Sequence, residues 1–211
     1  MSLSVVVVVL QLIAAIWSGF QESGDTHKSS IRGWTLRAFA LADYEIGIDH
    51  RTVHSGMGSG FVEYTVDPMV IHPRRGPAYL LQAFKAGKFA GKRVRLTAFL
   101  KSERAGRDPF LWMHWEGGAS PGSYGLTPAK NADSSGWVRQ ECVVDIPQSA
   151  TVIAMGASMG WRGTIWLDDF MIEIVGDEVP LSGEPGQGIF SLKLMYLETI
   201  ADVPVNPGFE D

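Results

Sequence analysis

The run GWRGTIWLDDFMIEIVG, residues 160–176, indicates the fold class, because apolar and polar residues alternate along it as they do on a half-buried β-strand. Asp168 and Asp169 lie side by side at its centre. Since successive side chains of a strand point to opposite faces, one of them is expected to share a packed face with Trp166 and Phe170. A carboxylate on a packed face is costly unless it is paired. We therefore expect a metal ion, a hydrogen-bond network or catalysis at this point.

From Trp34 onward the chain alternates between strand-like runs and turns. Apolar and β-branched runs at residues 79–84, 93–102 and 110–115 are separated by the glycine-bearing turns KAGKFAGK and ERAGRDP. No stretch shows sustained helical periodicity with caps. Short strands with glycine and proline punctuation predict an all-β domain, an antiparallel β-sandwich of the jelly-roll type.

The composition limits the class of function. The chain has 211 residues and a net charge of -5, which suits one globular domain with extra segments and gives no basic footprint for nucleic acid. Cys142 is the only cysteine, so an intrachain disulfide and a cysteine metal cluster are both excluded. It lies on a strand-like run, where we expect a small buried hydrophobe.

The amino-terminal residues 1–17 allow two interpretations. The apolar run from Val5 to Trp17 has about the length of a signal-peptide core, but no positively charged segment precedes it. A signal peptide predicts a secreted or cell-envelope protein. A valine-rich run is equally typical of an extra buried strand, which predicts a cytoplasmic protein.

The remaining chain divides into a domain and a tail. Residues 18–176 are expected to form the β-sandwich, and residues 177–211 a linker and tail that supply one more strand or a short helix. The sequence NPGFED at 206–211 echoes SGFQESG at 18–24, since both present Gly-Phe followed by acidic or amide residues. This echo predicts that the tail opens a second module.

Five pieces in order resemble one known family. They are GFQES…GW, HSGMGSGFVEY, LLQAFKAGKFAGKRVRLTAFLKS, GWVRQECVVDIP and GTIWLDDFMIEIVG. Over residues 18–176 the chain resembles galactose-binding-domain-like jelly rolls, the carbohydrate-binding-module type of β-sandwich. The resemblance implies a non-catalytic module that binds carbohydrate or another polar ligand. It also implies that Trp34, Trp137 and Trp166 are core residues.

The same resemblance implies a structural calcium ion. Carried over by position, its ligands are Glu22, Ser59 or the neighbouring backbone carbonyls, and the paired aspartates Asp168 and Asp169. Calcium takes carboxylate and carbonyl oxygens from several loops. In this chain Gln21 stands between the phenylalanine and Glu22, which moves the carboxylate to the other face of a strand. The alternative is that the paired aspartates accept hydrogen bonds from backbone groups at a corner of the sheet.

Loop aromatics are the predicted ligand-binding residues. Trp161 lies in a turn with Arg162 beside it, while Trp115 and Tyr124 flank the loop EGGASPGSYG and His114 precedes it. Aromatic rings stack on the CH-rich face of a sugar, and loops on a rigid sandwich are a usual place for binding. Each such ring is alternatively a lid over a core edge.

Two groups of residues suggest a chemistry other than ligand binding. Asp49, His50 and His54 suggest a metal site but lack a further ligand, so surface residues flanking a hairpin are the simpler interpretation. Glycoside hydrolysis by Glu116 with Asp133 or Asp145 is the least favoured function. A structural or protein-interaction domain without a small-molecule ligand is the main alternative to carbohydrate binding. Further domains of the same chain are possible partners, and no membrane partner beyond a signal segment is predicted.

Overall fold

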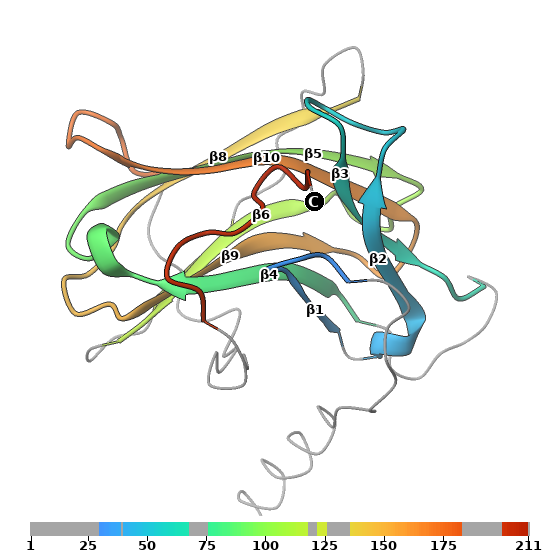
Figure 1. Ribbon diagram of the computed structural model, residues 1–211, viewed down its shortest axis with the longest axis horizontal. Coiled ribbons are helices and arrows are strands. Elements are labelled where there is room, and N and C mark those ends of the chain that lie inside the picture. Colours follow the sequence, from blue (N-terminus) through green and yellow to red (C-terminus); the bar gives the residue numbers. More distant parts are fainter. Residues whose placement is uncertain are drawn as a thin grey trace, which may run out of the picture.

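The computed structural model describes residues 30–38, 40–67, 76–117, 122–125, 136–182 and 200–210, with only the backbone of 122–125. In this part of the chain ten strands form two five-stranded sheets in which every neighbouring pair of strands is antiparallel, which confirms the predicted β-sandwich of the jelly-roll type. Figure 1 shows the two sheets as two layers.

The first sheet has the order β1-β4-β9-β6-β7 and the second the order β2-β3-β10-β5-β8. The strands of the first sheet are β1 (Thr35–Ala38), β4 (Ala78–Lys85), β9 (Val152–Met159), β6 (Phe110–Glu116) and β7 (Gly122–Gly125). Those of the second are β2 (Tyr44–Asp49), β3 (Ser59–Tyr64), β10 (Thr164–Val175), β5 (Arg93–Glu103) and β8 (Val138–Asp145). Among the described residues, two short 3-10 helices, η2 (Leu41–Asp43) and η3 (Gly87–Phe89), lie in connections.

Alternation along β5 shows how the sequence builds the sandwich. Val94 and Leu96 are fully buried between the sheets. On the opposite face, Arg95 pairs with Glu173 of β10 through a 2.8 Å contact between Nε and Oε1. Opposite charges on neighbouring strands support the register that the apolar side chains set.

The three tryptophans that the resemblance assigns to the core, Trp34, Trp137 and Trp166, are all buried. Trp34 belongs to the main core cluster, whereas Trp137 and Trp166 are buried outside it. Cys142 is fully buried among apolar neighbours, and burial raises the pKa of its thiol to about 12. The thiol is therefore protonated at neutral pH and acts as a small hydrophobe.

The carboxyl-terminal residues 200–210 close one edge of the sandwich. Ala201 forms an isolated parallel bridge with Phe84 of β4, and Phe209 is fully buried in the core. In Figure 1 this dark red segment runs from the edge of β4 toward β10 and β3. We refer to residues 200–210 as the closing segment.

Several predictions lie outside the described residues. These are the two interpretations of residues 1–17, the calcium ligand Glu22 and most of the linker, residues 183–199. Within the described part of the chain, no helix has the length and apolar character needed to cross a membrane.

Candidate functional site

The paired aspartates Asp168 and Asp169 lie at a β-bulge in β10. The pairing of β10 with β5 shifts register between Asp168 and Met171, and Asp169 has a positive φ of 51°. One extra residue is thereby inserted into β10. As a result Phe170 turns into the core, whereas Trp166 lies outside the main core cluster. The expectation that Trp166 and Phe170 share a face is wrong, because it assumed uninterrupted alternation.

Asp168 is fully buried and accepts hydrogen bonds from backbone N–H groups. Its Oδ2 accepts from the N–H of His54 at 2.9 Å and of Ser55 at 3.2 Å, and its Oδ1 from the N–H of Asp169 at 2.8 Å. Burial raises the pKa of the Asp168 carboxyl, while these donors oppose that rise. The carboxylate thus fastens the turn after β2 onto the bulge of β10.

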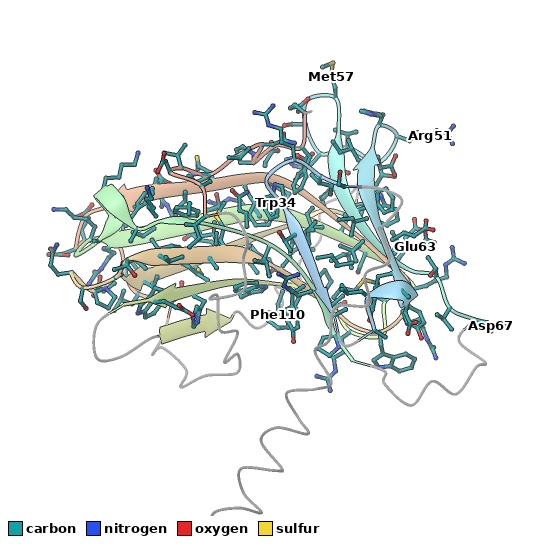
Figure 2. The ribbon with its side chains drawn as sticks, turned by 60° about the horizontal axis from the view of Figure 1, so that its bottom comes forward. Trp34, Arg51, Met57, Glu63, Asp67 and Phe110 are labelled. Carbon is teal, nitrogen blue, oxygen red and sulfur yellow. The ribbon has the colours of Figure 1, made fainter. Side chains whose placement is uncertain are left out.

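Asp169 contacts the same turn from the solvent side, and we call Asp168, Asp169, His54 and Ser55 the aspartate node. The Ser55 hydroxyl donates to its Oδ1 at 2.8 Å, and Nδ1 of His54 lies 2.7 Å from its Oδ2. The His54 ring stacks on Phe99 with centroids 3.5 Å apart. Met57 lies at the exposed tip of the same turn, as Figure 2 shows.

The residues at this node already have hydrogen-bond partners, and the calcium ion that the resemblance implies stays a prediction. Three N–H donors use three of the roughly four lone-pair sites of the Asp168 carboxylate, two on Oδ2 and one on Oδ1. Ser59 is also engaged, because its hydroxyl donates to the carbonyl of Thr52 at 2.6 Å. Among the described residues, no three His, Cys, Asp or Glu side chains cluster as metal ligands. The geometry is that of the hydrogen-bond alternative.

A second feature lies on the outer face of the first sheet. There Tyr79 of β4 and Phe110 of β6 flank Ser158 of β9, and Leu81 and Trp112 flank Gly156 in the next row. Leu81, Ala83, Trp112 and Ala154 form an apolar cluster separate from the main core, against which Tyr79 and Phe110 pack. The rings of Tyr79 and Trp112 meet edge-on at 6.3 Å. We call Tyr79, Phe110, Trp112 and His114 the aromatic face.

His114 is the polar residue of the aromatic face. It is only 5% exposed, and neither ring nitrogen makes a hydrogen bond with the described residues. The nearest carboxylate, Oε1 of Glu116, lies 3.7 Å from its Nε2. Burial lowers the pKa of His114, and Glu116 partly opposes this effect. The imidazole is therefore neutral at pH 7 and presents one donor and one acceptor.

The predicted ligand-binding residues are only partly brought together. His114 lies on the aromatic face, but its neighbour Trp115 points the other way, into the main core, and is 3% exposed. The loop-rim position expected for Trp115 is not observed, because it belongs to strand β6. Tyr124 pairs with Met113 through β7, and its side chain lies outside the described residues.

Trp161 and Arg162 form a separate pair in the turn between β9 and β10. The Arg162 guanidinium lies 4.8 Å from the centre of the Trp161 ring. This turn belongs to the end of the sandwich where Phe110 pairs with Ser158. The pair is thus placed as a loop aromatic, as predicted, and its role in ligand contact stays a prediction.

Sequence reasoning missed Tyr79, Phe110 and Trp112 as site residues. The signal was present in FLWMHW, where Phe110, Trp112 and His114 occupy alternate positions of one strand. Alternate positions share a face, so these three side chains point outward together.

The residues suggested for a metal site and for glycoside hydrolysis have other partners or lie on different sheets. Asp49 accepts a hydrogen bond from the Trp166 indole at 2.8 Å, and His50 contacts the carbonyl of Met57. Asp145 pairs with Arg93 at 2.8 Å in the second sheet, which lowers the pKa of its carboxyl. Glu116 lies in the first sheet, and Asp133 is outside the described residues.

The two antiparallel sheets form an all-β sandwich, and solved structures of this kind are similar to the chain. One is the xylan-binding domain CBM22-1 from Paenibacillus barcinonensis, with 14% identity, a TM-score of 0.48, and coverage of 71% of this chain and 90% of that one. A second is a family 61 carbohydrate-binding module in complex with β-1,4-galactotriose, with 12% identity, a TM-score of 0.47, and coverage of 74% and 98%. These are modules of the class that the sequence resembles.

Two further similarities come from other classes of protein. The enzymatically active domain of tailspike protein 4 of bacteriophage CBA120 has 13% identity and a TM-score of 0.51, over 74% of this chain and 21% of that one. An uncharacterized HTH-type transcriptional regulator of Bacillus subtilis is 27% identical over 186 residues, which is 87% of this chain. The chain spans 58% of the length of that relative. No family model matches the sequence.

Proposed function

We propose that the protein is a non-catalytic module that binds carbohydrate through the aromatic face. The observation that carries the proposal is the aromatic row on the outer side of the first sheet, in which Tyr79 and Phe110 are partly exposed. Trp112 and His114 of the same row are buried, at 1% and 5% exposed. Aromatic rings offer apolar area to the CH-rich face of a sugar ring. A few polar groups beside such rings fix the orientation of a ligand.

His114 and Glu116 supply the polar groups that sugar hydroxyls need. The neutral imidazole provides a donor and an acceptor, and neither nitrogen is hydrogen-bonded to the described residues. The Glu116 carboxylate is an additional acceptor close to it. A hydroxyl that joins His114 removes the cost of a buried polar group without a partner, which favours a polyhydroxylated ligand.

The carboxylates support binding over hydrolysis. Glycosidases that use two carboxylates place them on the two sides of the scissile bond, roughly 5–9.5 Å apart. Among the described residues whose side chains point outward from β4, β6 and β9, Glu116 is the only carboxylate. A second acid at that spacing therefore has no candidate in this part of the chain.

Calorimetric titration with xylo- and galacto-oligosaccharides tests the proposal. Tyr79→Ala and Phe110→Ala should each weaken binding about fivefold, since a stacked aromatic is worth roughly 1 kcal/mol. Met171→Ala is the matched control, because Met171 is an exposed apolar residue of the other sheet. Absence of binding to any oligosaccharide, or equal loss in the Met171 variant, would contradict the proposal.

A second candidate function is suggested by the bacterial relative. A chain that matches part of a transcriptional regulator is a candidate for its effector-binding region, with carbohydrate as effector. DNA binding by the full gene product, measured with and without the oligosaccharide that binds the chain, distinguishes the two. A change in DNA affinity supports the regulator, and a gene product without DNA-binding activity removes it.

The two candidates differ in location. Export, predicted from the apolar run at residues 5–17, belongs to the first candidate alone. Intact-mass measurement of the protein recovered from cells and from the medium tests it. A secreted form that lacks the first residues supports export.

A further inference from the structure

We propose that the closing segment is exchangeable between copies, so that residues 200–210 of one chain occupy the edge of the sandwich of a second copy. This inference does not depend on carbohydrate binding. It rests on how the segment is held and on how it is connected to the sandwich.

The closing segment is held by contacts that are local to a slot on the sandwich. The side-chain amide of Gln82 donates to the carbonyl of Val205 at 3.2 Å and accepts from its N–H at 2.9 Å. The indole of Trp34 donates to the carbonyl of Asn206 at 3.1 Å, and the N–H of Phe170 to the carbonyl of Pro207 at 3.0 Å. The last of these donors lies in the β10 bulge.

Phe209 is the anchor of the segment. Its ring is fully buried and stacks on Trp34 with centroids 4.8 Å apart. The slot is shaped for this ring, because a Cβ on Gly60 would lie 2.4 Å from a ring carbon. Beyond it, the Glu210 carboxylate accepts from the N–H of Met57 at 3.0 Å.

Without the closing segment the sandwich is incomplete. The Trp34 indole and the N–H of Phe170 lose their acceptors, Gln82 loses its backbone partner and the apolar slot of Phe209 opens. The same slot can accept residues 200–210 from its own chain or from a second copy, because the contacts are the same in both cases. Exchange of an identical element between protomers costs little, because the same contacts form in both arrangements.

The connection between sandwich and segment permits this exchange. Ser182 exchanges two hydrogen bonds with Val143 of β8 in the second sheet, and the closing segment begins at Ile200 beside β4 in the first. Residues 183–199 join them, and a chain of that length spans on the order of 50 Å when extended. Docking on the same copy does not depend on protein concentration, whereas docking on a second copy does, so high concentration favours the exchange.

The first experiment uses the full chain. Isotopically heavy and unlabelled protein are mixed at increasing concentration, incubated and analysed by native mass spectrometry. We expect dimers of mixed mass whose share rises with the protein concentration. Absence of mixed dimers at the highest soluble concentration overturns the proposal.

The second experiment identifies the surface that makes the dimer. Lys85 and Asp202 pair at 2.8 Å between strand β4 and the closing segment, and both side chains are well exposed, so cysteine at either position should be tolerated. In a mixture of Lys85→Cys and Asp202→Cys chains under a thiol-exchange buffer, exchange produces a disulfide between the two variants. The double variant should instead close the bond within one chain and lose the mixed dimers.

A matched control uses Arg139→Cys in place of Lys85→Cys. Arg139 is an exposed residue of β8, in the other sheet. It should give no disulfide with Asp202→Cys above the level of random encounter. Two results would overturn the proposal. They are mixed dimers without the cross-link between positions 85 and 202, and mixed dimers that persist in the closed double variant, since either kind forms through another surface.

Discussion

At the level of single residues, three backbone N–H groups point at the carboxylate of the buried Asp168. Asp168→Ala removes the acceptor and leaves these part-buried donors without it, at a cost of about 1 kcal/mol each, the lower end for an unsatisfied group. We expect the free energy of unfolding to fall by about 3 kcal/mol or more in urea titrations. Asp169→Asn is the control, since Asp169 is partly exposed and should cost less. Equal stability of the Asp168 variant and the wild type would show that the node does not support the fold.

His114 gives a prediction about pH. Burial lowers its pKa below the ordinary value of 6.5, so the unfolded chain binds a proton at this residue more readily than the folded chain. Stability must therefore fall as the pH drops below 6.5 toward the lowered pKa. Melting temperatures from pH 7.5 to 5 should decline more in the wild type than in His114→Gln.

A control on the neighbouring carboxylate separates the causes of this effect. Glu116 raises the pKa of His114, so Glu116→Gln should extend the acid-side loss of stability to lower pH. If His114→Gln and the wild type give parallel profiles, His114 does not titrate differently in the two states.

At the level of elements, the strands were predictable and the bulge was not. Strands β4, β5 and β6 contain the predicted runs, because alternation and glycine turns are local signals. The bulge in β10 depends on distant partners, namely the turn at His54 and Ser55 and the carbonyl of Pro207. The same limit affected the site, since Trp115 was predicted as a rim residue from loop proximity although strand parity places it opposite His114.

The closing segment as an element makes a prediction about stability. Phe209→Ala should lower the free energy of unfolding by about 3–5 kcal/mol, because it removes a fully buried ring and leaves a cavity beside Trp34. Val203→Ala is the matched control in the same segment, since Val203 is 61% exposed and should change stability little. A small effect at Phe209 would mean that the segment contributes little to the sandwich.

At the level of the whole molecule, the similar motifs at residues 18–24 and 206–211 can be compared with the position of the second one in the fold. Within the motif NPGFED, Phe209 and Glu210 dock on the sandwich itself, and the opening of a second module by this motif stays a prediction. The phenylalanine and the acid of the Gly-Phe-acid motif each have a structural role at this place. Phe209 fills the edge of the core, and the Glu210 carboxylate accepts a hydrogen bond from the turn at Met57. The segment with the corresponding motif, residues 18–24, lies outside the described residues.

Thermal unfolding with and without calcium tests the whole molecule for the ion that the family resemblance implies. A ligand that binds only the folded state stabilises it by about 2.7 kcal/mol at a hundredfold excess over its dissociation constant. Because the oxygens of Asp168 already accept N–H bonds, we expect the same melting temperature in EGTA and in millimolar calcium. A clear rise with calcium that is lost in Glu22→Gln, but kept in Asp169→Asn, would place the ion at the amino-terminal segment. A rise lost in Asp169→Asn would instead show that calcium displaces the hydrogen bonds from His54 and Ser55.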